Sequence, residues 1–220
     1  SDWDAGKHLS DLRKHQAMLE IIDQISDSSS LINPKSPYER IPAILGRISE
    51  CKREGKTLGD LQRVAQEYDA LMAEKSKPTT KQHVKNLLQA KKFRDFIDLF
   101  ARYEEYCKEH GSYDYDDMIL VVLKALSEED WMLQSLQERY QYILVDEAQD
   151  LNGAQWNVIE RLTTYADNPN DPNFFLVGDD DQAIYRFQGA NIAHLLQFRD
   201  RFPKAPIIVL QTSYRSTQVI

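Results

Sequence analysis

The sequence predicts an α/β protein in which a helical first half, residues 1–112, precedes a parallel sheet in residues 113–220. Two observations predict this class. Apolar residues of the first half recur at the i, i+3, i+4 spacing of helices that bury one face. In the second half, short continuous apolar runs alternate with helical segments, which is typical of strands buried on both faces of a parallel sheet. Hydrophobic residues make up 42% of the chain, so a packed core is expected.

The first half is predicted to contain two helices before a long third one. The first of them runs from Leu12 to Ile25, stops at the serine-rich stretch 26–30, and is followed by a loop that Pro34 and Pro37 mark. The second begins after Thr57, which is suited to cap it because Asp60 stands three residues later. Its apolar stripe consists of Leu61, Val64, Ala65, Tyr68, Leu71 and Met72.

The long third helix follows Thr80, and Gly111 is suited to end it as a C-terminal cap. Its stripe consists of Val84, Leu87, Leu88, Phe96, Leu99, Phe100 and Tyr103.

Three strands are expected in the second half, over residues 142–145, 173–177 and 207–210. Helical segments, 154–165 and 191–202, separate them. Strands that alternate with helices form right-handed crossovers and a parallel sheet. Ligands of such sheets bind beyond the carboxyl ends of the strands.

The composition excludes several classes of protein. The net charge of −8 argues against a protein wrapped in nucleic acid, although a net charge averages over local patches. No apolar run approaches the roughly 18 residues of a membrane span, and no basic-then-apolar leader suggests secretion. Cys51 and Cys107 form no ligand-like cluster and are expected to be reduced thiols of a cytoplasmic protein.

Polar clusters follow each predicted strand, at 146–150, 178–185 and 211–217, and should converge at one edge of the sheet. Asp146 ends a buried strand, and a hard carboxylate there suits Mg²⁺, which takes one or two carboxylates plus phosphate oxygens and waters. The adjacent Glu147 is placed to accept a proton from an attacking water. The pair therefore suits metal-assisted hydrolysis of a nucleotide. The alternative is a solvated turn that caps the next helix.

Three motifs together resemble those of UvrD/Rep helicases of superfamily 1. Residues 145–150, Val-Asp-Glu-Ala-Gln-Asp, resemble the Walker B motif of that family. Residues 177–190 resemble its third motif and Tyr214–Thr217 its fourth, while Gly111–Asp117 looks like its acidic-aromatic turn. The resemblance covers residues 111–217 strongly, and the helical half matches as the insert of the first motor domain. It implies a partial RecA-like P-loop NTPase sheet in residues 113–220 and a helical insertion domain in residues 1–112.

The resemblance also implies roles in hydrolysis for individual residues. Asp146 would hold Mg²⁺, and Glu147 would orient and deprotonate the attacking water of Mg-ATP hydrolysis. Gln149 and Gln182 would sense the terminal phosphate. Arg215 would neutralise transition-state charge, and Tyr214 would stack on the adenine.

The same resemblance implies contacts with single-stranded and duplex DNA. Tyr185 and Phe187 would face the DNA, where aromatic rings hold bases. Residues 75–94 contain seven Lys or Arg and no Asp or Glu, so Lys85, Lys91 and Lys92 are candidates for phosphate contacts. The alternative is a charged helix face that meets only water.

Three departures limit the resemblance. Ala148 replaces a frequent aromatic residue, a variant also common in the family's helicase-nuclease relatives. Phe187-Gln188 stands where the family usually has Trp-Arg, and Ser213 stands where it usually has Asn.

The family also needs a Gly-x-x-x-x-Gly-Lys-Thr loop to cradle phosphates. Gly55-Lys-Thr57 imitates its end, but Glu50 stands at the first glycine position, so a turn between helices is expected there.

The leading hypothesis is therefore a fragment of an ATP-dependent DNA translocase that unwinds 3′ to 5′, inactive as an isolated piece. Two alternatives stay open: the motor part of a helicase-nuclease, and a non-catalytic interaction module. The second is opposed by the intact set Asp146, Glu147, Gln182 and Arg215. A calcium loop at 179–181 is disfavoured because it lacks the glycine and the later bidentate glutamate of such loops.

Overall fold

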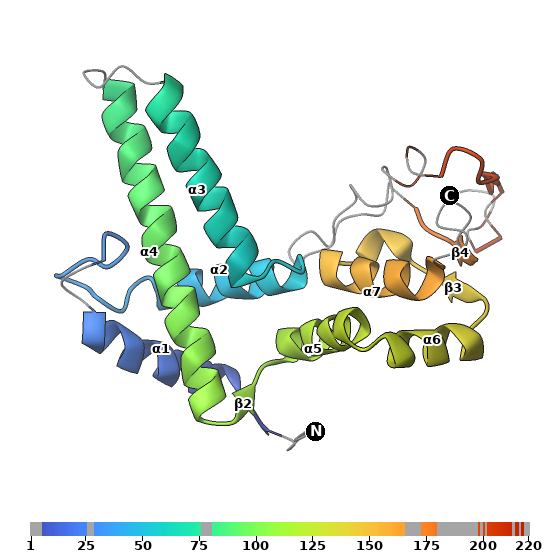
Figure 1. The fold of residues 1–220 in the computed structure, drawn as a ribbon, viewed down its shortest axis with the longest axis horizontal. Helices are drawn as coiled ribbons and strands as arrows, with labels where there is room; N and C mark the ends of the chain where they lie inside the picture. Colours follow the sequence, from blue (N-terminus) through green and yellow to red (C-terminus); the bar gives the residue numbers. More distant parts are fainter. Residues whose placement is uncertain are drawn as a thin grey trace.

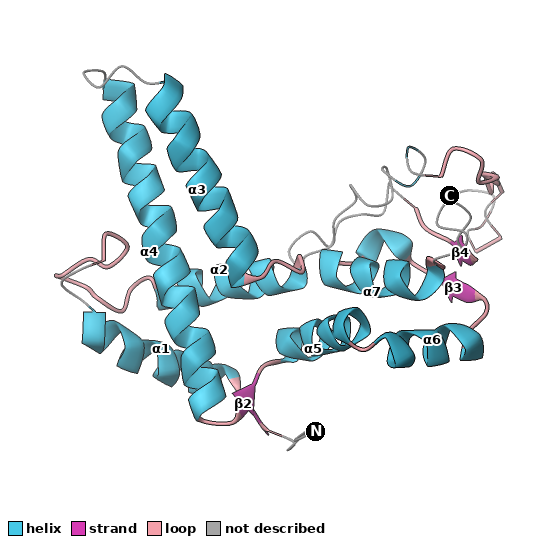
Figure 2. Cartoon of the chain, in the orientation of Figure 1, coloured by secondary structure: helices cyan, strands magenta, loops and turns pink. Residues whose placement is uncertain are grey.

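The structure is a computed structural model, and it describes residues 6–25, 29–75, 81–165, 173–179, 198, 200, 202–212, 214, 215 and 217. Figure 1 shows a long helical hairpin that rises from a base of crossing helices, with a second lobe of shorter helices and a small sheet beside it. Figure 2 shows that helix predominates. The strands of the described residues form two separate pairs. The predicted mixed α/β class with parallel strands is confirmed.

Four helices make up the first half: α1 (Asp11–Ile25), α2 (Ile41–Arg53), α3 (Leu58–Lys75) and α4 (Lys81–Glu109). The three predicted helices correspond to α1, α3 and α4. The N-terminus of α3 carries the predicted cap, because the backbone N–H of Asp60 donates to the Thr57 hydroxyl and Asp60 accepts from the N–H of Thr57. Helix α2 was not predicted. Gly55, at φ +67°, forms the expected turn between α2 and α3.

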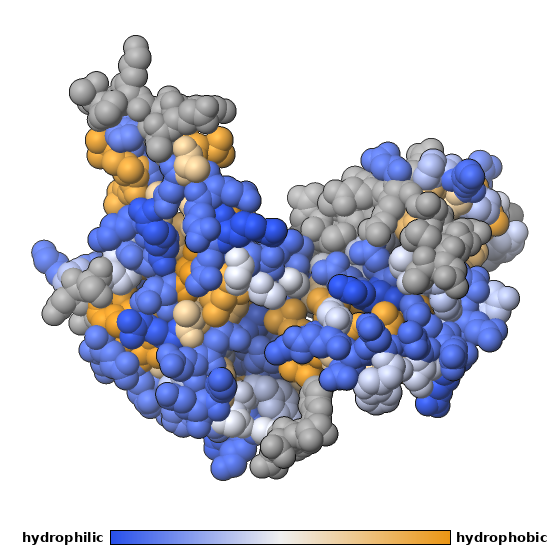
Figure 3. Space-filling view, in the orientation of Figure 1, coloured by the Kyte–Doolittle hydropathy of each residue, from blue (hydrophilic) through white to orange (hydrophobic). Residues whose placement is uncertain are grey.

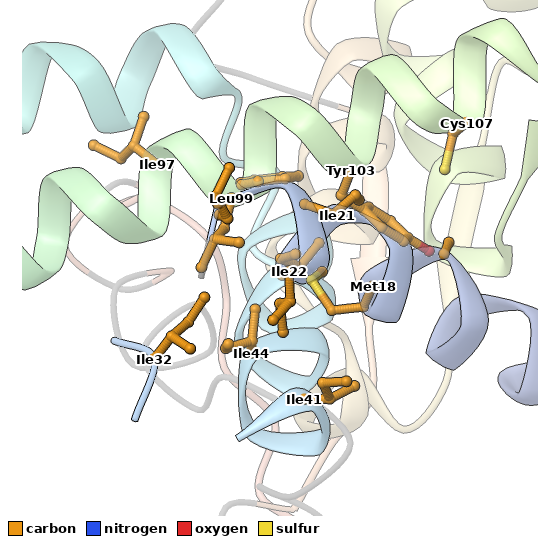
Figure 4. Close-up of a cluster of buried hydrophobic side chains, with 14 of the residues drawn as sticks. Met18, Ile21, Ile22, Ile32, Ile41, Ile44, Ile97, Leu99, Tyr103 and Cys107 are labelled. Atoms are coloured by element: carbon orange, nitrogen blue, oxygen red, sulfur yellow. The ribbon is translucent and has the colours of Figure 1, made fainter. Parts of the chain in front are cut away.

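The core of the first half lies where α1, α2 and the lower part of α4 cross. Figure 4 shows Ile22 of α1, Ile44 of α2 and Leu99 of α4 pointing into one cluster, with Tyr103 at its edge. All four side chains are buried. Such interdigitated apolar side chains supply most of the stability of a small domain.

The hairpin of α3 and α4, here called the arm, leaves the predicted apolar stripe partly exposed. Val84, Leu87 and Leu88 are exposed on α4, and so is Leu71 on α3. Figure 3 shows this apolar surface on the flanks of the arm. The expectation that the whole stripe is buried is wrong for this upper part, because α4 continues past the crossing with α1 and α2.

The second half begins with a two-stranded parallel pair, β1 (Lys7–His8) with β2 (Ser112–Tyr113), which joins the start of the chain to the end of α4. Helices α5 (Tyr115–Glu128) and α6 (Asp130–Arg139) follow, and neither was predicted. Strand β3 (Ile143–Val145), the 3₁₀ helix η1 (Ala148–Asp150), helix α7 (Gly153–Thr163) and strand β4 (Phe174–Leu176) complete it. Strands β3 and β4 pair in parallel, as predicted, and Leu144 lies opposite Phe175.

Two expectations about the sheet are wrong. Leu144 is 75% exposed and Phe175 is 55% exposed, so only one face of the β3–β4 pair is covered. That face packs on α7, where the rings of Trp156 and Phe174 meet edge to face. Residues 207–210, predicted as a third strand, are exposed coil, because no described strand offers them a backbone partner.

The predicted helix 191–202 lies mostly outside the described residues. At its end, the N–H of Phe202 donates to the carbonyl of Phe198 over 2.8 Å, as in a helix. Both rings lie edge to face against Phe174, at 5.6 and 5.7 Å between centroids. None of the helices that the structure describes is long and apolar enough to cross a membrane.

Candidate functional site

The candidate site lies where strands β3 and β4 end. The N–H of Val177 donates to the carbonyl of Val145 over 2.8 Å, and the N–H of Ala148 donates to the carbonyl of Val177 over 2.9 Å. These bonds continue the parallel pairing past the ends of both strands. The polar clusters that follow the first two predicted strands therefore meet at one edge, as the sequence predicted.

Glu147 has an unusual backbone conformation. Its φ of 51° and ψ of 44° place it in the left-handed region, and it is the one non-glycine residue with positive φ in the described part of the chain. Such a conformation costs on the order of 1–3 kcal/mol and is concentrated at functional sites. Its backbone N–H donates to Oδ1 of Asp146 over 2.9 Å, so the preceding carboxylate stabilises the turn.

Gln149 connects the two strand ends. Its Nε2 donates to Glu147 Oε2 over 2.7 Å, and its Oε1 accepts the backbone N–H of Asp179 over 3.0 Å. If the amide were flipped, its oxygen would face the Glu147 carboxylate and its NH₂ group would face the N–H of Asp179. Neither contact would be a hydrogen bond, so the two partners determine which atom is nitrogen. Gln149 is 2% exposed, and its contacts position Glu147 relative to Asp179.

Gly178 permits this close approach. A Cβ atom on Gly178 would lie 2.9 Å from Oε1 of Gln149 and 3.4 Å from Cβ of Ala148. Any larger residue would therefore push the β4 end away from the turn that carries Glu147. The sequence contains this glycine in its third motif, but only the structure shows what it accommodates.

Helix α7 has a cap of its own, which answers the alternative interpretation of the acidic pair. Asn152 accepts the N–H of Gln155, and the Gln155 side chain accepts the N–H of Asn152, which forms a complete capping box. Asp146 and Glu147 are exposed and do not cap α7. Their carboxylates are thus available for a ligand at the strand ends.

The donor set fits magnesium better than an all-protein metal cage. Within the described ranges, no group of three or more His, Cys, Asp or Glu side chains could hold a metal ion. Mg²⁺ does not need such a group, because it commonly takes one or two carboxylates and completes its shell with phosphate oxygens and water. Asp146 is exposed at the strand end, and only its Oδ1 has a recorded hydrogen bond.

Two further residues predicted for hydrolysis, Tyr214 and Arg215, make no recorded contact with Asp146 or Glu147. Tyr214 is 95% exposed and Arg215 is also exposed; neither has a recorded hydrogen bond or ion pair with another described residue. Gln182, Tyr185 and Phe187 lie outside the described residues. Their predicted roles stay predictions.

The described part of the basic window lies at the end of α3, which is Lys75, and on α4 over residues 81–94. Lys85 and Lys91 are exposed on α4, and Lys92 is half-buried. Arg94 is different, because its guanidinium pairs with Asp69 of α3 at 2.5 Å. The positive charge of Arg94 is therefore offset by Asp69.

A buried charge cluster ties the helical half to the acidic-aromatic turn, and sequence analysis missed its centre. Lys52 of α2 is fully buried. Its Nζ lies 2.5 Å from Asp117 Oδ1, 2.8 Å from Glu104 Oε1 and 3.2 Å from Asp114 Oδ2. Asp114 and Asp117 also form the capping box of α5. A lysine on an amphipathic helix gives no sign in the sequence that it is buried.

Burial and pairing compete for the pKa values in this cluster. Burial lowers the pKa of Lys52, but the carboxylates of Asp114, Asp117 and Glu104 outweigh it, so the net pKa lies above the ordinary value. Burial, with the nearby Asp114 charge, raises the pKa of Asp117 to about 6 despite Lys52. For Asp114, burial raises the pKa, but Lys52 and the Asp117 N–H lower it more, so its net pKa lies below the ordinary value.

The contact between the end of α2 and the start of α7 depends on a close approach of the two backbones. A Cβ atom on Gly153, the first residue of α7, would lie 3.0 Å from the carbonyl oxygen and 3.1 Å from Cα of Glu54, at the end of α2. A Cβ atom on Gly55 would lie 2.9 Å from Nδ2 of Asn157. The end of α2 and the start of α7 are thus in direct contact through two glycines, which fixes the helical half against the helix that follows the candidate site.

Comparison with known proteins places the chain in a family. A family model described as the UvrD/REP helicase N-terminal domain matches residues 4–203. The ATP-dependent DNA helicase PcrA of Bacillus subtilis (strain 168) is 30% identical over 213 residues, covering 95% of this chain and 25% of PcrA. PcrA of Staphylococcus aureus (strain Mu50) is 30% identical over 207 residues, covering 91% of this chain and 24% of PcrA. YjcD of Bacillus subtilis (strain 168) is 38% identical over 122 residues, which are 56% of this chain and 15% of YjcD.

The chain thus spans about a quarter of the length of the PcrA relatives that it matches. The matched range includes the strand ends with Glu147 and Gln149 as well as the helices of the first half. On this coverage, the chain belongs to the UvrD/Rep helicase family, whose N-terminal domain it matches.

Proposed function

We propose that this chain is part of a longer ATP-driven DNA helicase and carries the residues that hydrolyse the nucleotide. Residues 113–220 would form part of its RecA-like motor sheet, and residues 1–112 its helical insert. The observation that carries the proposal is the convergence of Glu147, Gln149 and Asp179 at the ends of two parallel strands. Nucleotide sites of open parallel sheets lie at such ends.

Asp146 and Glu147 would divide the work at this edge. Mg²⁺, held by Asp146, would polarise the phosphates of ATP and neutralise their developing charge. Glu147 would accept a proton from the attacking water, and its exposed carboxylate is held from one side by Gln149. The left-handed backbone at Glu147 supports this assignment because strain of this kind is retained where a side chain must be aimed.

Gln149 would act as a positioning residue rather than a direct phosphate sensor, because both ends of its buried amide already have protein partners. Gln182 would sense the terminal phosphate. Arg215 would neutralise transition-state charge, and Tyr214 would stack on adenine. The exposure of Tyr214 and Arg215 leaves both side chains accessible to a bound nucleotide.

DNA would lie along surfaces outside this edge. We propose that Lys85, Lys91 and Lys92 contact phosphates of single-stranded or duplex DNA, and that Tyr185 and Phe187 stack on bases. The exposure of Lys85 and Lys91 supports the first part. Translocation would run 3′ to 5′, as the family resemblance implies, and the expected cytoplasmic location stays a prediction.

The deciding experiment measures DNA-stimulated ATP hydrolysis by the longer protein and by its Glu147→Gln variant. Loss of the general base should slow turnover by about 10²–10⁴-fold while nucleotide binding is nearly unchanged. Glu138→Gln is the matched control, because Glu138 is an exposed carboxylate on α6 outside the site. Turnover by the wild type that is no faster than by Glu147→Gln would indicate a non-catalytic interaction module instead.

The 220-residue chain on its own provides a second test of the proposal. Its sequence contains no Gly-x-x-x-x-Gly-Lys-Thr loop, so it lacks the backbone cradle that holds the β- and γ-phosphates. We therefore expect no steady-state phosphate release above that of its own Glu147→Gln variant. Release above that control would mean that the strand-end residues suffice for hydrolysis.

A further inference from the structure

Helix α4 crosses α2 close to the segment that leads into α2 (Figure 1). Residues of α2, of the middle of α4 and of that segment line a groove. Its volume is about 760 Å³, within the roughly 300–1,000 Å³ of pockets that bind ligands. It lies on the helical half and contains no residue of the strand-end site. Its floor is apolar and is formed by Leu31, Ala43, Ile44, Phe93 and Phe96.

Charged side chains surround this floor on several sides. The cations are Arg40, Arg47, Lys56 and Lys92, and the carboxylates are Glu50 and Glu54. Arg47 and Glu50 neutralise each other, since the guanidinium lies 2.6 Å from the carboxylate. Arg40, Lys56 and Lys92 have no recorded ion pair with another described residue, so the rim presents net positive charge.

The apolar floor and the positively charged rim together indicate which kind of ligand the groove would bind. An apolar floor favours aliphatic or aromatic side chains, because their burial there removes both surfaces from water. A positive rim favours carboxylates at the edges of the same segment. This is the arrangement of grooves that bind an amphipathic peptide, with apolar anchors inside and polar contacts at the rim.

DNA fits the groove less well. The positive rim would attract phosphates as well as carboxylates, so the apolar floor decides between the two kinds of ligand. Base edges need hydrogen-bonding partners, which Leu31, Ala43 and Ile44 do not offer through their side chains. Phe93 and Phe96 also pack against the core, which leaves less of each ring free for stacking.

We propose that this groove is a docking site for an acidic peptide segment of a partner protein, which inserts apolar side chains between α2 and α4 and places carboxylates against Arg40, Lys56 and Lys92. The site is separate from the strand-end carboxylates, and the inference does not depend on the helicase activity proposed above. The proposed peptide contains apolar residues that are flanked by acidic residues.

The first part of the test is selection of ligands from a random peptide phage library by the 220-residue chain. The expected outcome is a consensus that combines acidic residues with aliphatic or aromatic ones. A synthetic peptide of that consensus, labelled with fluorescein, then gives an affinity by fluorescence anisotropy. No enrichment, or a consensus without acids, would overturn the proposal.

Charge reversal tests the site on the protein. Lys56→Glu/Lys92→Glu turns two attractions into repulsions, so we expect the peptide affinity to fall about tenfold or more. Lys85→Glu/Lys91→Glu is the matched control, because it makes the same charge change on the exposed face of α4 outside the groove. Ala43→Trp fills the groove from an exposed position without a charge change and should also abolish binding. Equal losses in the Lys56/Lys92 variant and its control would indicate attraction to the net charge alone and would contradict the docking site.

Cys51 supplies an independent reporter, because it lines the groove and is half-buried, whereas Cys107 is buried in the core. Burial raises the pKa of Cys51, so labelling with iodoacetamide is carried out at alkaline pH, where the pKa of Cys107, about 12, keeps that thiol protonated. Saturating peptide should slow Cys51 labelling. If the peptide leaves the labelling rate unchanged, or if a fluorescein-labelled oligothymidylate protects Cys51 and the peptide does not, the proposal is wrong, and the second result would assign the groove to DNA.

Discussion

Lys52 and Asp117 lie 2.5 Å apart between Nζ and Oδ1, at the junction where helix α2 meets the first turn of α5. One is the fully buried centre of a charge cluster, and the other is a capping residue of α5. This pair couples the helical half of the molecule to the segment that leads toward the candidate site.

Lys52→Met should strongly destabilise the fold. The substitution keeps most of the side-chain volume but leaves the buried Asp114 and the half-buried Asp117 without their cation, and breaking a buried ion pair costs about 3–5 kcal/mol. The measurement is the free energy of unfolding in urea. Lys124→Met is the control, because Lys124 is exposed and its ion pair with Glu128 is long, at 3.9 Å. This substitution should change the free energy of unfolding by less than about 0.5 kcal/mol. Similar effects of both substitutions would show that the cluster contributes no specific stability.

Asp117→Asn should change how stability depends on pH. The pKa of Asp117 is raised to about 6 in the folded chain, so between about pH 4 and pH 6 the folded state holds a proton that the unfolded state has lost. The stability that this proton contributes is present at about pH 4 and is lost as the pH rises through 6. The uncharged asparagine removes that loss, so stability relative to the wild type should increase from pH 4 to pH 7. A difference that is constant over this range would contradict the raised pKa.

Gln149→Met should loosen the strand ends without removing either acidic residue. The substitution deprives Glu147 of a donor and leaves the N–H of Asp179 without its acceptor, which should cost about 1–3 kcal/mol. Hydrogen exchange at the Asp179 amide should accelerate, and urea unfolding should occur at lower concentration. Gln134→Met, at an exposed position on α6, is the matched control. Unchanged exchange at Asp179 in the Gln149 variant would mean that the bridge does not order the β4 end.

Lys91→Ala/Lys92→Ala tests the proposed phosphate contacts in the longer protein. Each lost contact should reduce the salt dependence of DNA binding by about one unit of slope, without a change in sequence preference. Phe187→Ala should instead lose about 1–3 kcal/mol per base with little change in that slope, because stacking is not ionic. A salt titration of single-stranded and duplex binding distinguishes the two. An unchanged slope in the lysine variant would leave these residues as a solvated surface.

The strand-end site was predictable in part because its elements are local. A buried strand followed by Asp146 and Glu147 marks the edge of a sheet, and the parallel pairing of β3 with β4 then brings the next polar cluster to it. The bridge through Gln149 was not predictable, since an amide in a motif gives no indication of whether it faces protein or ligand. Its burial depends on the path of residues 177–179, which lie 28 or more positions further along the chain.

The predictions were wrong for segments whose secondary structure or burial depends on neighbouring elements. An apolar run such as 207–210 becomes a strand only when another strand supplies backbone partners, and the run itself contains no information about them. The same holds for Leu144, whose side chain was expected to be buried and is largely exposed. Helix α2 was missed because its buried residues, Ile41, Ile44 and Ile48, form a short stripe between a proline-marked loop and the Gly55 turn.

The length of α4 gives the Lys52 cluster a mechanical consequence. Glu104 contributes to the cluster near the lower end of this helix, and at about 1.5 Å per residue the stretch up to Lys81 is about 35 Å long. The buried charges thus lie about 35 Å from the far end of α4. A tilt of about 5° at the charge cluster would displace that far end by about 3 Å. Small rearrangements of the acidic-aromatic turn would thus be transmitted to the exposed end of the arm, well away from the carboxylates at the strand ends.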